Sequence, residues 1–111
     1  MSIESKIDAL RIKLANALNW LDIPGVDSQH LQNVANKCYR NRSQFDNKEN
    51  TLVCAIEGAC RALALLNFAS PTEIQTINEQ IIELRRNVDS LEQALKFISP
   101  SRIDVISSCL K

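Results

Sequence analysis

The chain has 111 residues, a length that suits a single domain with one hydrophobic core. Thirteen basic and thirteen acidic residues leave a formal net charge of zero, so no overall field draws the protein toward nucleic acid or an anionic membrane. Hydrophobic residues make up 45% of the chain, with only two glycines and three prolines, which argues against a sandwich or barrel and favours an all-α protein.

The first predicted helix runs from about Ile3 to Leu21, with Ser2 as its N-cap. One face of this helix carries a line of apolar residues, which we call its apolar seam. Charged residues fill most of the other faces, and Ile12 is an apolar exception nearly opposite the seam. Pro24 and Gly25 end the helix and turn the chain. The apolar seam advances in steps of four and three residues, through Ile3, Ile7, Leu10, Leu14, Ala17 and Leu21.

A shorter helix is predicted from Asp27 or Ser28 to Tyr39, because either first residue can cap it. The polar residues that follow predict a loop over about 40–46. Basic residues gather at the end of this helix, beside Tyr39, and Phe45 flanks the loop on the other side; the basic residues are Lys37, Arg40 and Arg42.

The third predicted helix runs from Asn47 to Ala69, and Asp46 with Glu49 forms a capping box at its start. From Leu52 onward it is apolar on almost every side, so it must be surrounded on most sides. A membrane span is disfavoured because Glu57 and Arg61 near the middle would each cost about 2.5 to 3.5 kcal/mol at a bilayer centre. We therefore predict a core helix and no membrane contact.

The fourth predicted helix, Ser70 to Ser99, carries an unbroken heptad pattern and would be roughly 40 Å long. Ser70 and Glu73 suggest a second capping box, with Pro71 at the first helical position. A last short helix, capped by Ser99 or Ser101, is apolar enough to dock on the rest. The heptad residues are Ile74, Ile77, Ile81, Leu84, Val88, Leu91, Leu95 and Ile98.

These elements predict one domain over residues 1–111. It is an up-and-down helical bundle of three long and two short helices, that is, a four- to five-helix bundle. Three helices cannot cover the third one. The two short helices could complete the cover, or a second copy of the chain could do so. The sequence leaves a homodimer open, since heptads serve bundles and coiled coils alike.

Enzyme signatures are absent from the sequence: both glycines stand alone, and no serine elbow or histidine-based metal motif is present. We predict no catalytic residue, no cofactor and no metal site. Cys54 and Cys60 diverge by about 120° on their helix, so they do not readily share a metal ion. The four cysteines read as buried thiols of a reducing compartment, and the amino terminus lacks an apolar signal core, so a cytoplasmic location is expected.

The remaining prediction is a non-enzymatic protein-protein interaction module, acting as an adaptor, chaperone, inhibitor or regulator through its helical surfaces. The alternative is a nucleic-acid-binding regulator that uses the basic segment Lys37 to Arg42 beside a helix, turn, helix arrangement. Aromatic and basic residues are the usual anchors of interfaces. The predicted partner-binding residues are Trp20, Tyr39, Arg40, Arg42, Phe45, Ile82 and Phe97.

Overall fold

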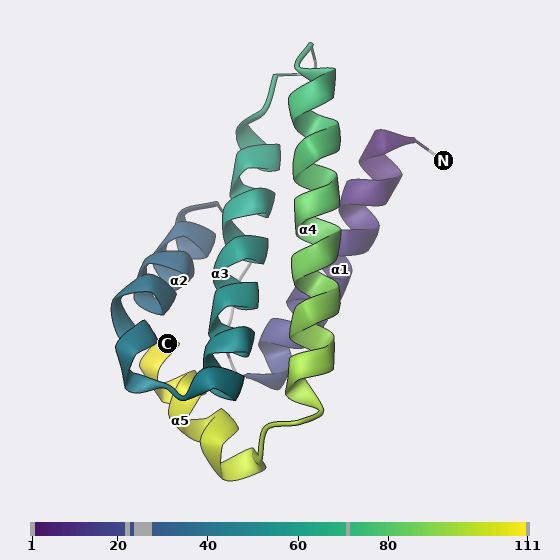
Figure 1. Cartoon of the computed structure of the whole chain (residues 1–111). Helices are drawn as coiled ribbons and strands as arrows, with labels where there is room; N and C mark the ends of the chain where they lie inside the picture. Colours follow the sequence, from purple (N-terminus) through teal and green to yellow (C-terminus); the bar gives the residue numbers. More distant parts are fainter. Residues whose placement is uncertain (1, 22, 24–27, 71, 111) are drawn as a thin grey trace.

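The computed structural model describes residues 2–21, 23, 28–70 and 72–110, and every regular element in this part of the chain is helical. The molecule measures 43 × 23 × 22 Å, so it is elongated along the long helices. The all-α prediction and the number of helices are therefore confirmed. The elements in chain order are α1 (Ile3–Trp20), α2 (Ser28–Asn41), the 3₁₀ helix η1 (Arg42–Gln44), α3 (Asn47–Phe68), α4 (Ile74–Leu95) and α5 (Pro100–Leu110) (Figure 1).

Two of the predicted helix caps are confirmed by hydrogen bonds. The Ser2 hydroxyl accepts from the Ser5 amide at 3.1 Å, which satisfies one of the free N–H groups that begin α1. At α3 the Asp46 carboxylate accepts from the Glu49 amide at 2.9 Å, and Glu49 accepts from the Asp46 amide at 3.2 Å. The Asp27 cap predicted for α2 lies outside the described residues.

The capping box predicted at Ser70 is wrong, and α4 begins at Ile74. The Ser70 hydroxyl accepts from the Thr72 amide at 3.4 Å, a local bond that competes with helical geometry. Glu73 takes the N-cap position without a side-chain bond, and Pro71 lies outside the described residues. With its end at Leu95, the helix is about 33 Å long rather than 40 Å.

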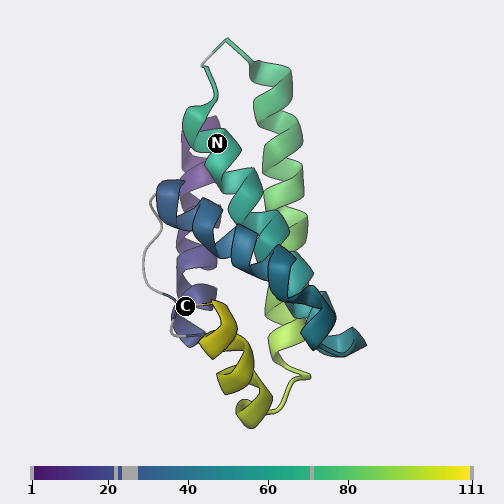
Figure 2. The ribbon, with the colours of Figure 1, turned by 90° about the vertical axis from the view of Figure 1, so that its left-hand side faces the viewer.

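Helix α3 lies between α2 and α4 and supplies the largest share of the core (Figures 1 and 2). These two neighbours cover most of the apolar surface of α3. Helices of the same chain therefore bury the helix that was predicted to be surrounded on most sides. The cover stops at the carboxyl end, where Leu65 and Phe68 are exposed. Of the described helices, only α3 is long and apolar enough to cross a membrane, and 61% of its most apolar window is buried in the fold.

The middle of the α4 heptad packs inward, with Ile81, Leu84, Val88 and Leu91 buried, whereas Ile74 at its start is exposed. Helix α4 runs antiparallel to α3, whereas α1 lies beside α4 and runs in the same direction (Figure 1). The three long helices α1, α3 and α4 thus alternate in direction along the chain (Figure 1).

Helix α5 closes one end of the bundle, as its apolar residues predict. Ile106 and Leu110 are fully buried, and the Ser107 hydroxyl donates to the carbonyl oxygen of Leu21 after α1. Arg102 reaches Glu49 in the first turn of α3. Figure 2 shows α5 at the end where α1 finishes and α4 turns back.

Candidate functional site

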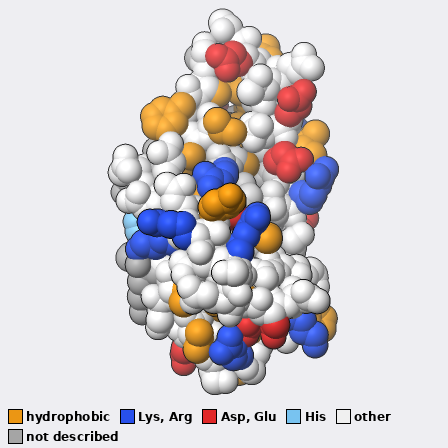
Figure 3. Space-filling view, turned by 60° about the vertical axis from the view of Figure 1, so that its left-hand side comes forward, with side chains coloured by type: hydrophobic (Ala, Val, Ile, Leu, Met, Phe, Trp, Pro, Cys, Tyr) orange, Lys and Arg blue, Asp and Glu red, His pale blue; other side chains and the backbone are white. Residues whose placement is uncertain are grey.

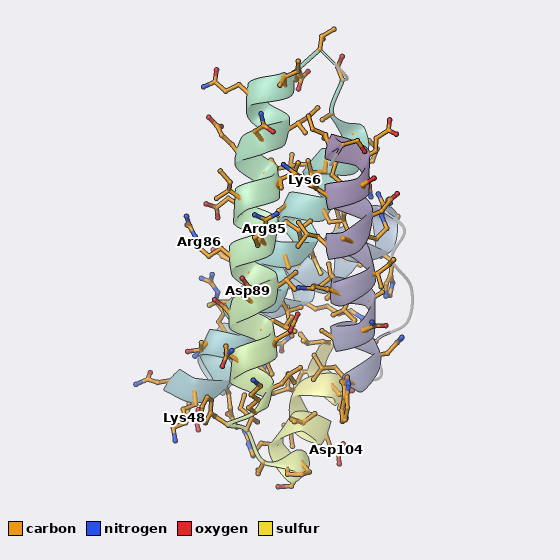
Figure 4. All side chains as sticks on the ribbon, turned by 90° about the vertical axis from the view of Figure 1, so that its right-hand side faces the viewer. Lys6, Lys48, Arg85, Arg86, Asp89 and Asp104 are labelled. Carbon is orange, nitrogen blue, oxygen red and sulfur yellow. The ribbon has the colours of Figure 1, made fainter. Side chains whose placement is uncertain are left out.

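An open groove of about 620 Å³ lies between the carboxyl-terminal half of α1, the end of α4 and the start of α5. Figure 4 looks onto this side, with α1 and α4 next to each other and α5 at one end. Apolar side chains dominate it, and we call it the Trp20 groove. It is lined by Lys13, Asn16, Ala17, Trp20, Glu92, Leu95, Lys96, Ile98, Pro100 and Ile103.

Trp20 is the only tryptophan of the chain and stands at the edge of the Trp20 groove with 79% of its surface exposed. A second hollow, lined by Asn16, Asn19 and Trp20, lies on the same helix. The indole therefore belongs to both hollows and does not close the core. Leaving so large an apolar side chain in water forgoes about 1.5 to 3 kcal/mol of burial energy.

A smaller hollow of about 250 Å³ lies at the same end of the molecule, beside Phe97. Phe97 is 73% exposed, while its neighbour Ile98 is buried and lines both this hollow and the Trp20 groove. The chain leaves α4 at Leu95, so these two residues no longer follow the helical register. Ile98 thus connects the hollow beside Phe97 with the groove beside Trp20, and both Trp20 and Phe97 are predicted contact residues.

The charged groups that line the Trp20 groove are two lysines and one carboxylate. Lys13 belongs to α1, and Lys96 and Glu92 belong to the end of α4. In the part of the chain that the structure describes, none of the three has an oppositely charged partner within 4.0 Å. Glu92 and Lys96 are four residues apart at the end of α4 but do not pair, whereas Glu83 and Arg86 on the same helix pair at 3.1 Å.

The α5 side of the Trp20 groove depends on the contacts that position α5 against the rest of the fold. Glu49 has a side-chain exposure of 5%, and Arg102 donates to both of its carboxylate oxygens, from Nη2 at 2.9 Å and also from Nε. These hydrogen bonds lower the pKa of Glu49 below its ordinary value, against the opposing effect of desolvation, and they raise the pKa of Arg102. This ion pair fixes α5, and with it Pro100 and Ile103 in the groove.

Tyr39 belongs to α2 and Arg42 to η1, and α2 lies on the side of α3 away from α4 (Figure 1). Figure 3 shows basic side chains gathered on this side of the molecule. The Arg42 guanidinium lies 5.5 Å from the centre of the Tyr39 ring, and its Nη2 lies 3.3 Å from Glu57. Arg61 also pairs with Glu57, at 3.1 Å. The carboxylate of Glu57 is nearly buried and neutralises part of this basic patch, in which Tyr39 is 63% exposed.

The remaining predicted contact residues divide between core and surface. Phe45 is only 8% exposed and belongs to the core, so its assignment to a binding surface was wrong. A bend after η1 turns its ring inward, and no periodic pattern of the loop signals that turn. Ile82 is exposed on α4 but lines none of the described hollows, and Arg40 is exposed and donates to the Asn36 carbonyl at 3.4 Å.

Of the residues that line the Trp20 groove, only Trp20 was among the predicted contact residues. The sequence pattern places Lys13 and Lys96 on ordinary charged helix faces, and it makes Leu95 and Ile98 the last two positions of the heptad. Pro100 and Ile103 enter only because α5 folds back under α1. No local signal marks such a junction of three elements; only the exposed Trp20 near a predicted helix end pointed to it.

The prediction of four buried thiols is confirmed for Cys38 and Cys60 but is wrong for Cys54, which is exposed, and Cys109 is half-buried. Cys38 and Cys60 are buried, and desolvation raises the pKa of both thiols, that of Cys60 to about 12. Within the described residues no three His, Cys, Asp or Glu side chains come together in a way that could hold a metal ion. A thiolate mechanism at these two positions is therefore disfavoured.

Comparison with known proteins provides no relative: no protein-family model matches the chain, and neither the curated proteins nor the solved structures contain a significant match.

Proposed function

We propose that the protein is a non-enzymatic interaction module that binds a protein partner at the Trp20 groove. The observation that carries this proposal is the exposure of Trp20 beside an open apolar groove. Tryptophan is among the residues that most often dominate binding energy, and it does so when a partner removes it from water. The neighbouring hollow beside Phe97 enlarges the apolar area available to a partner at the same end.

The alternative function, nucleic-acid binding, would use the other face. An exposed aromatic ring beside arginines is suited to stacking on bases, and Tyr39 with Arg40 and Arg42 has this chemistry. Two observations weigh against it. Arg42 and Arg61 already share Glu57, and the net charge of the chain is zero. Protein binding at the Trp20 groove is therefore preferred.

Site-specific photocrosslinking in the native cell tests the proposal. Benzoylphenylalanine is placed at Trp20, and the control variant carries it at Ile12, which is 61% exposed on the same helix but does not line the groove. We expect a discrete protein crosslink from position 20 and none from position 12. Equal crosslinking from both positions would refute a specific groove. The same group at Tyr39 tests the alternative, which predicts crosslinks to nucleic acid.

A further inference from the structure

The geometry points to an acidic amphipathic helix of a partner protein as the occupant of the Trp20 groove. This inference rests on the proposed function and names the chemistry of the partner. It combines three properties of the groove: its shape, its apolar lining and the sign of its charged rim.

The shape favours a helix over other forms of peptide. Strand addition requires a free sheet edge, and the described residues contain no strand. Proline-rich segments dock in grooves lined by several aromatic residues, and Trp20 is the one aromatic side chain that lines this groove. A groove between two neighbouring helices suits an amphipathic helix, which lays its apolar side chains into such a space.

The apolar lining residues come from three helices, so they can contact successive apolar side chains along a bound helix. Trp20 and Ala17 form one wall on α1, Leu95 forms the wall on α4, and Ile103 lies on the α5 side. A bound helix with apolar residues at i, i+3, i+4 and i+7 presents a continuous stripe to walls of this kind. The open form of the groove and the 79% exposure of Trp20 favour a macromolecule over an enclosed small ligand.

The charges on the rim of the groove indicate that the partner helix is acidic. Lys13 and Lys96 stand on opposite walls, and both lack a described ion-pair partner within 4.0 Å, so they are available to carboxylates on the flanks of a bound helix. Glu92 is the single lining residue of opposite sign and reduces the rim charge to about +1. Asp104 follows the lining residue Ile103 in sequence but does not line the groove, and Figure 4 shows it on α5 at the end of the molecule.

Selection from a displayed library of random 16-residue peptides, with counter-selection on the Trp20→Ala protein, tests this assignment. We expect enriched peptides with apolar residues at helical spacing and an excess of Asp and Glu. Binding of one enriched peptide is then measured through the fluorescence of Trp20, the only tryptophan of the chain. The Lys13→Glu/Lys96→Glu protein should bind this peptide about tenfold more weakly or worse, and Glu92→Gln should bind it more tightly.

The matched control is Lys6→Glu, which changes the same charge on α1 outside the groove (Figure 4) and should leave the affinity within about twofold. Enriched peptides that are basic, or that lack helical spacing, would overturn the assignment of an acidic helix while leaving protein binding in place. Failure to enrich any peptide that requires Trp20 would also overturn it. The crosslinks from position 20 report on the proposed function independently.

Discussion

At the scale of single residues, the most consequential contact is the ion pair between Arg102 and Glu49. It joins the first turn of α3 to α5, two segments that are 53 residues apart, and Glu49 is nearly buried. A buried carboxylate is stable only when its partner satisfies it, because water no longer solvates the charge. The local capping bond from Asp46 gives Glu49 a second role at the start of α3.

Replacing Arg102 by Met should lower the midpoint of thermal unfolding at pH 7. The pKa of Glu49 is depressed in the folded state, so its ionised form contributes stability that is present above the ordinary value of 4.5 and is lost as the pH falls through the folded pKa. The difference between Arg102→Met and the parent should therefore shrink below pH 4.5. Circular dichroism melts between pH 3 and pH 7 measure it.

The control for this experiment is Arg86→Met, which removes the exposed pair with Glu83. Exposed pairs contribute about 0.2 to 1 kcal/mol, so the loss at neutral pH should be small. Equal losses in the Arg102 and Arg86 variants at every pH would show that Glu49 does not depend on Arg102.

At the scale of elements, the close contact of α3 with α4 depends on a residue without a side chain. A Cβ atom added at Gly58 would lie 2.5 Å from Oδ1 of Asn87 on α4. The Asn87 amide meanwhile donates to the Glu83 carbonyl at 2.8 Å, which holds the side chain in this place. Two helices can approach closely here because one of them contributes only backbone.

The Gly58→Ala substitution should destabilise the protein by about 1 to 2 kcal/mol, although alanine favours a helix by about 1 kcal/mol over glycine. The added methyl group must displace the Asn87 side chain. In an Asn87→Ala background the same substitution should instead stabilise by about 0.5 to 1 kcal/mol. Urea unfolding of the four proteins of this double-mutant cycle measures the coupling. Identical effects of Gly58→Ala in both backgrounds would refute the contact.

At the scale of the whole molecule, the helices are unequally enclosed. Helix α3 is covered by α2 and α4, whereas α1 packs mainly on α4, and its first two turns contribute only the half-buried Ile3 and Ile7. The enclosure of α3 by its own chain means that a second copy is not required to cover it. A homodimer stays a prediction that sedimentation at several concentrations would check.

Amide hydrogen exchange should reflect this unequal enclosure. The amides in the middle of α3, around Ile56 and Leu63, should exchange only through global unfolding, because both side chains are fully buried. Amides of the first two turns of α1 should exchange at least about tenfold faster through local opening. Mass spectrometry of peptic fragments resolves the two regions. Equal protection of both would show that α1 opens together with the core.

The sequence by itself determined the helices, the seams and two caps. Apolar periodicity and a side chain that accepts a backbone N–H are local properties, so α1, α3 and the buried middle of α4 followed from them. It also identified Trp20 and Phe97 as apolar residues outside the seams, and both are exposed. It placed Phe45 on the surface and started α4 three residues too early. The reason is that a competing turn bond and an inward bend have no periodic signature.

Only the tertiary structure decided the direction of α1 beside α4, the docking of α5 and the Trp20 groove that results. Each depends on segments far apart in the chain: Arg102 on Glu49, Ser107 on Leu21, and Lys13 opposite Lys96. The free energy that selects these arrangements comes from burial summed over the whole core, which no window of the sequence contains. The candidate site is formed where three helices meet, so it exists only after they have packed.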